Sequence, residues 1–183
     1  HVPLSHADDH LEIRSMRTAQ DFVIKTLGEC RFESPLPRGK RLFVTDDRRV
    51  LLKDELGAGD SVNEELSLQR AGPRRRIFFD PQSTTVAIVT CGGLSPGLNN
   101  VIRSVYYDLA HNYKVQRVLG IRDGYRGLNP AEGRPPIELD ARAVHDIHNL
   151  GGTMLGSSRG GQDPAVMVDY LESEGIDVLL CVG

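Results

Sequence analysis

The sequence has little of what marks several large classes of protein. Its three cysteines, Cys30, Cys91 and Cys181, lie far apart and form no CxxC pair. Such a pattern is typical of a reducing compartment and argues against a disulfide framework or a zinc site. No apolar run approaches the roughly 20 residues that a membrane-spanning helix needs, and the mean hydropathy is negative. We therefore expect neither a disulfide-rich secreted protein nor a membrane protein.

An excess of charge of one sign is also missing. The chain has 22 Lys and Arg residues against 25 Asp and Glu residues, which gives a net charge of −3, and the two signs are interspersed. Proteins that bind nucleic acids or membrane surfaces through bulk charge usually carry a basic patch or tail. We expect no partner of either kind.

The character of the sequence changes near Pro81. Residues 1–80 show no sustained period and are predicted to form an N-terminal extension, with a short helix over 17–30 and a hairpin of Arg41–Thr45 with Arg49–Lys53. In residues 81–183, apolar β-branched runs at 85–90, 116–121 and 177–182 alternate with helical stretches at about 97–111, 143–150 and 163–175. Such alternation predicts an α/β fold with a doubly wound, mainly parallel sheet.

A glycine-rich loop, Cys91–Asn100 (CGGLSPGLNN), follows the first of these strands and precedes a helix. Ligands of such sheets bind at the carboxyl ends of the strands, where glycine backbone and a helix N-terminus suit a phosphate. The loop matches neither GxGxxG nor GxxxxGK[ST]. From the local chemistry alone, a phosphate site and a tight strand–helix turn remain equal alternatives.

A second glycine-rich loop, Gly151–Gly161 (GGTMLGSSRGG), adds hydroxyl groups and one arginine, Arg159. A guanidinium offers a fixed fork of donors that fits phosphate oxygens. The alternative is an exposed linker with an incidental arginine. Two such loops in one α/β unit favour a phosphate-binding site over that alternative.

At these residues the sequence resembles a known family. VTCGGLSPGLNNVIRS, GIRDGYRGLNP and HNLGGTMLGSSRGGQDP, followed by GIDVLLCVG, are similar to successive motifs of the 6-phosphofructokinase family, in the same order and at the same spacing. The resemblance covers about residues 71–183. With the lead-in AGPRRRIFFDP, it is strongest to the long ATP-dependent branch of trypanosomatids and plants, which is related to diphosphate-dependent enzymes.

The resemblance implies roles for four residues at matching positions. Gly93 would place its backbone against the nucleotide phosphates, Arg159 and Gly160 would contact the donor nucleotide, and Tyr125 would line the same cleft. Tyr125 as a turn aromatic packed on the sheet is an equal alternative. Arg103 matches an effector-binding arginine of the short bacterial enzymes and would otherwise be a solvated helix residue.

No catalytic or metal-binding residue is predicted within this chain. In the family, the strand that corresponds to Ile176–Val182 leads into a GGDG[ST] loop whose aspartate helps to hold Mg²⁺, and the sequence here ends at Gly183. The metal ligand, the catalytic base and the sugar-binding residues are therefore expected beyond Gly183. Because the first residue is His1, we also expect the natural N-terminus to lie upstream.

The resemblance implies a glycolytic phosphotransferase that converts ATP and fructose 6-phosphate to ADP and fructose 1,6-bisphosphate, with ATP and Mg²⁺ as cofactors. The expected protein is a cytoplasmic homo-oligomer, a dimer or a tetramer, with a glycosome or plastid left open as its compartment. Two alternatives remain within the family, a diphosphate-dependent enzyme and a non-catalytic regulatory subunit. A relative of NAD or lipid kinases is a third, against which the PGLN and GSSRGG motifs argue.

Overall fold

The computed structural model describes residues 26–37, 43–52 and 57–183. The contacts among these residues divide the chain into two compact units. One unit contains residues 26–31 and 43–78, and the other contains residues 32–37 and 79–183. The predicted boundary between residues 80 and 81 stays a prediction.

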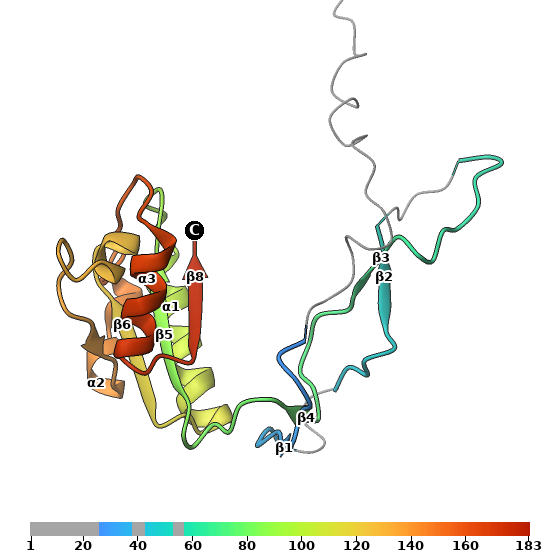
Figure 1. Cartoon of the computed structure of the whole chain (residues 1–183), viewed down its shortest axis with the longest axis horizontal. Coiled ribbons are helices and arrows are strands. Elements are labelled where there is room, and N and C mark those ends of the chain that lie inside the picture. The colour runs from blue at the N-terminus through green and yellow to red at the C-terminus, as the bar shows by residue number, and fades with distance from the viewer. Residues whose placement is uncertain (1–25, 38–42, 53–56) are drawn as a thin grey trace, which may run out of the picture. The chain divides into compact units, whose positions relative to one another are not determined.

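A four-stranded sheet organises the larger unit (Figure 1), with the strand order β7-β6-β5-β8. Strands β5 (Thr85–Thr90), β6 (Arg117–Ile121) and β8 (Val178–Val182) are parallel, with β8 at one edge of the sheet. They lie where the apolar runs of the sequence predicted them. The short strand β7 (Ile137–Glu138) joins β6 in the antiparallel sense and was not predicted. The fold is an α/β fold with a mainly parallel sheet.

Strand β5 is buried on both faces, which explains its unbroken apolar sequence. Its side chains alternate between two apolar clusters, with Val86 and Ile88 in one and Ala87 and Val89 in the other. The first cluster contains Ile102 of helix α1 (Leu98–Tyr107), and helix α3 (Pro164–Ser173) packs against the second. Figure 1 accordingly shows α3 in front of the sheet and α1 behind it.

The helices are shorter or more broken than the sequence predicted. Helix α1 gives way to a π-helix, η2 (Asp108–Tyr113). The helix predicted over 143–150 is instead α2 (Ala141–Val144) followed by a 3-10 turn, η4 (Ile147–Asn149). Another 3-10 helix, η3 (Gly124–Leu128), follows β6. Asp140 caps α2 by accepting a 2.6 Å hydrogen bond from the backbone N–H of Ala143, so that helix starts earlier than predicted.

In the described part of the smaller unit, the regular elements are short strands. Strand β2 (Arg49–Leu51) pairs with β3 (Ser67–Gln69) in the antiparallel sense. The predicted hairpin is therefore wrong, since the partner of β2 lies downstream. Residues 43–45 form no strand, and the backbone N–H of Val44 donates to Pro73.

The two remaining strands are short: β1 (Phe32–Glu33) belongs to the larger unit and β4 (Arg76–Ile77) to the smaller. The helix predicted over 17–30 falls mostly outside the described residues, and its described part, 26–30, is not helical. Among the described residues, no helix has the length and apolar character required to cross a membrane.

Candidate functional site

Two glycine-rich segments meet at the carboxyl ends of the parallel strands. The first glycine loop (residues 91–97) connects β5 to α1, and the second glycine loop (residues 151–161) lies between η4 and α3. The first loop follows β5 directly, and the second lies at the same end of β5 because the hydroxyl group of Thr90, the last residue of that strand, bonds to Thr153 and Gly156. The fold thus brings together two loops that are about 60 residues apart in the sequence.

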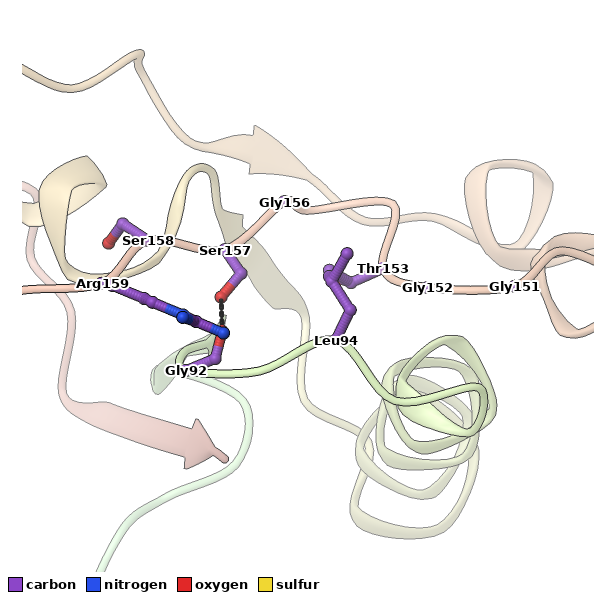
Figure 2. A pocket seen from close by; sticks show the side chains of 9 residues that line it. All are labelled: Gly92, Leu94, Gly151, Gly152, Thr153, Gly156, Ser157, Ser158 and Arg159. Carbon is purple, nitrogen blue, oxygen red and sulfur yellow. Dashed lines mark hydrogen bonds between the residues drawn. The ribbon is translucent and has the colours of Figure 1, made fainter.

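Direct hydrogen bonds join the two loops. The hydroxyl group of Ser157 donates to the carbonyl oxygen of Gly92 over 2.7 Å (Figure 2). The backbone N–H of Gly92 in turn donates to the carbonyl oxygen of Ser158 over 3.3 Å. Gly92 has a φ of +74°, which favours glycine at this turn. The two loops therefore form one surface with a fixed separation.

Thr90, the last residue of β5, anchors the second glycine loop to the sheet. Its side chain is fully buried, at 0% exposure. Its hydroxyl group donates to the carbonyl oxygen of Gly156 over 2.7 Å. The hydroxyl oxygens of Thr90 and Thr153 are 2.9 Å apart. Since each hydroxyl has a single proton, the Thr153 hydroxyl is the donor of that second bond. Sequence reasoning missed this role, although a hydroxyl at the end of a buried strand could have indicated it.

A tight turn after β6 supports the second glycine loop from the side. The backbone N–H of Asp123 donates to Leu155 over 2.8 Å. Gly124 lies so close to the loop that an added Cβ would be 2.6 Å from the backbone nitrogen of Ser158. The side chain of Asp123 accepts two hydrogen bonds from Arg134, at 2.6 and 2.7 Å. These hydrogen bonds lower the pKa of Asp123, so its carboxylate stays ionised.

The two loops enclose an open cavity of about 530 Å³. Of the nine described residues that line it, Arg159 alone is charged. Figure 2 shows its side chain reaching from the second glycine loop towards Gly92 of the first. The lining residues are Gly92, Leu94, Gly151, Gly152, Thr153, Gly156, Ser157, Ser158 and Arg159. A single cation among main chain and hydroxyl groups gives the cavity a preference for an anionic ligand.

Most of the glycines in these loops face open space rather than protein. At seven of these glycines, an added Cβ would have no atom of the protein within 4 Å: Gly92, Gly93, Gly97, Gly151, Gly152, Gly160 and Gly161. Packing within the described chain therefore does not require glycine at these positions, apart from those with positive φ. Glycine leaves the backbone accessible, so a ligand can approach the peptide groups closely. The first turn of α1, at the end of the first loop, also has no side-chain cap and no acidic residue.

The four residues predicted as nucleotide contacts take different places. Arg159 lines the cavity, Gly93 lies between the lining residues Gly92 and Leu94, and Gly160 directly follows Arg159. Tyr125 is not among the lining residues, and its ring packs against the apolar cluster that contains Cys91. Hydrogen bonding to the thiol of Cys181, together with the nearby Cys91, raises the pKa of Tyr125 to about 12.

The cavity offers nothing that suits a metal ion. Its lining contains no carboxylate, imidazole or thiol, and the described residues contain no cluster of three or more such side chains. Oxygen ligands from carboxylates are what Mg²⁺ requires of a protein. The described lining residues of this cavity therefore do not by themselves fit Mg²⁺.

Comparisons with known proteins find related sequences. A family model described as Phosphofructokinase matches residues 85–183. ATP-dependent 6-phosphofructokinase of Trypanosoma cruzi is 50% identical, over 100% of this chain and 38% of its own length. The enzyme of the same name from Amycolatopsis methanolica is 46% identical, over 89% of this chain and 38% of its own length. ATP-dependent 6-phosphofructokinase 1 of Arabidopsis thaliana is 47% identical, over 79% of this chain and 29% of its own length.

Among solved structures, the crystal structure of Pichia pastoris phosphofructokinase in the T-state aligns with a TM-score of 0.48 and 25% identity, over 68% of this chain and 13% of that one. The chain spans 38% of the length of the first curated relatives that it matches. The family match covers the sheet, both glycine loops and the turn after β6. On this evidence of sequence, the chain belongs to the phosphofructokinase family.

Proposed function

We propose that the full-length protein transfers the γ-phosphate of ATP to the 1-hydroxyl group of fructose 6-phosphate, and that this chain supplies the donor side of the site. One observation carries the proposal. The two glycine loops enclose a cavity with a single cation at the carboxyl ends of the parallel strands. That is the place and the chemistry at which an α/β sheet holds the phosphates of a nucleotide.

Four residues have proposed roles in holding the donor. Arg159 would bind phosphate oxygens through its planar fork, which is suited to bidentate contact. Gly93 and Gly160 would let the phosphate chain approach the backbone, since an added Cβ at either position would meet open space. Tyr125 would act at the margin of the nucleotide cleft, from its position against the core.

Phosphoryl transfer depends mainly on positioning the reactants and stabilising the charge that develops on the transferred group. Among the described residues that line the cavity, Arg159 is the one that can stabilise charge on the donor. The sugar hydroxyl group needs a carboxylate that accepts its proton. Because the cavity lining has no carboxylate, we propose that the base and the magnesium ligands lie outside these residues.

Two other functions fit the same cavity. Diphosphate could replace ATP as the donor, because the described lining contacts suit phosphates rather than a base or ribose. A regulatory subunit could bind the nucleotide without catalysing transfer. The names of the relatives in T. cruzi, A. methanolica and A. thaliana all specify ATP, which supports the kinase with ATP as its donor.

A steady-state assay of the full-length protein decides among these functions. Fructose 6-phosphate and Mg²⁺ are kept saturating while ATP or diphosphate is varied, and fructose 1,6-bisphosphate is measured by a coupled reaction. We expect turnover on the order of 1–100 s⁻¹ with ATP and none with diphosphate. Turnover with diphosphate alone would favour the second function, and ATP binding without turnover would favour a regulatory subunit.

The proposal also covers the state of the protein in the cell. We propose a homo-oligomer, a dimer or a tetramer, located in the cytoplasm. Light scattering coupled to size-exclusion chromatography of the full-length protein measures the first, and fractionation of cells measures the second. Recovery in an organelle fraction would contradict the cytoplasmic location.

A further inference from the structure

One polar side chain is buried in the apolar face of α1 and has no place in the cavity. Asn99 is the second residue of that helix and is 2% exposed. Its amide nitrogen donates to the carbonyl oxygen of Leu150 over 3.0 Å. Its amide oxygen accepts a hydrogen bond from the backbone N–H of Met154 over 2.7 Å. Both polar ends of the side chain are therefore used.

These two bonds hold the start of the second glycine loop. They join Asn99 to both ends of the segment 150–154, which contains Gly151, Gly152 and Thr153. All three of those residues line the cavity, whereas Asn99 does not. The chain bends at Gly151 and Gly152, and Gly152 has a φ of +78°. The amide thus ties down both ends of a bend whose residues line the cavity.

We propose that Asn99 is a positioning residue of the donor site, which sets the path of residues 150–154 and thereby the affinity for the phosphates of the donor. The proposal rests on the proposed function, because it assigns the cavity to the donor. It adds a residue that the ligand does not touch. Asn99 also links the two loops, since it lies two residues after Gly97, where the first glycine loop ends.

An amide is needed because the two backbone groups have opposite polarity. The Leu150 carbonyl oxygen requires a donor and the Met154 N–H requires an acceptor, and asparagine offers both from one short side chain. Aspartate keeps the acceptor but places a second acceptor against the carbonyl oxygen. Alanine leaves both backbone groups without a partner in a buried place, which is costly for the folded loop.

The test compares Asn99→Ala and Asn99→Asp with Asn100→Ala, a neutral change at the exposed neighbour on α1. In the full-length protein, we expect Asn99→Ala to raise the KM for ATP at least about tenfold. The KM for fructose 6-phosphate should change by less than about twofold, because a local change in the donor wall leaves the sugar site in place. The Asn100→Ala variant should match the unchanged protein in both constants.

Hydrogen–deuterium exchange supplies a second measurement that needs no substrate. Peptides that cover residues 150–156 should exchange faster in Asn99→Ala, and less so in Asn99→Asp, which still accepts from Met154. Peptides from β5 should exchange as in the unchanged protein. A merely apolar packing role for Asn99 would predict no difference between the two variants in residues 150–156.

Two results would overturn the inference. One is unchanged exchange of residues 150–156 in Asn99→Ala. The other is a parallel rise of both KM values with a lower Tm in every Asn99 variant, which would indicate a general role in folding. If the unchanged protein neither binds nor turns over ATP, the proposed function fails instead, while the exchange measurement still decides whether Asn99 holds the loop.

Discussion

Replacement of Arg159 is the most direct probe of the cavity. The guanidinium is the only charge among the nine described lining residues, so no neighbouring cation in the lining can substitute for it. A charged hydrogen bond contributes about 1.5–3 kcal/mol. Because each 1.4 kcal/mol corresponds to about tenfold in affinity, Arg159→Ala should raise the KM for ATP by roughly ten- to a hundredfold.

The assay varies ATP and fructose 6-phosphate in turn on the full-length protein. The KM for the sugar should stay nearly constant, since Arg159 is assigned to the donor. Arg159→Lys should recover part of the loss, because an ammonium group keeps the charge but not the planar fork.

Arg117→Ala is a matched control for this experiment. Arg117 is exposed, begins β6 at the opposite end of the strand from the cavity, and donates to Glu174 over 3.1 Å. Its loss should leave both KM values unchanged. If Arg159→Ala leaves the KM for ATP and kcat within about twofold of the unchanged protein, then Arg159 is an incidental surface residue and the reasoning fails.

Three further predictions follow from the same contacts. The 183-residue chain alone should have no measurable kinase activity in the coupled assay, since its cavity lacks a carboxylate; turnover near 1 s⁻¹ or above would refute this. Thr90→Val should lower the free energy of unfolding by about 1–3 kcal/mol, because the carbonyl oxygen of Gly156 loses its buried donor. Thr90→Ser should lower it by about 1 kcal/mol, for the loss of one methyl group. Equal Tm values for the two variants would contradict this role of the Thr90 hydroxyl group. Hydrogen bonds from Arg134 lower the pKa of Asp123 below 3.8. The stabilisation that they give is therefore present above that value and is lost as the pH falls through the lowered pKa. The Tm difference between the unchanged protein and Asp123→Asn should shrink from about pH 5 to about pH 3, and a constant difference would disprove the assignment.

The sheet could be predicted from the sequence because its parallel strands are apolar runs, of which β5 is buried along its whole length. The first glycine loop could be placed because it lies between a strand and a helix, β5 and α1. Strand β7 could not be predicted, because it has only two residues and follows two prolines, so its sequence shows no periodic pattern. The partner of β2 was missed for a similar reason, because its pairing with β3 depends on a connection of 15 residues between them.

The contacts that hold the cavity were harder to foresee than its lining. Arg159 stands out in the sequence because its neighbours are glycine and serine. Asn99 and Thr90 belong to an amphipathic helix and an apolar strand, where a polar residue has many possible partners. Their partners, such as Leu150 and Gly156, become neighbours only when the chain has folded. Sequence spacing alone does not contain that information.

The cavity wall is largely main chain, since four of its nine lining residues are glycines. Peptide groups are the same in every variant, so truncating side chains one at a time removes little of what a ligand would touch there. Among the lining side chains, truncation should therefore remove a direct contact with the ligand mainly at Arg159. Point substitutions would likewise give little resistance to an inhibitor that binds peptide N–H groups, because resistance would require a change in the backbone conformation.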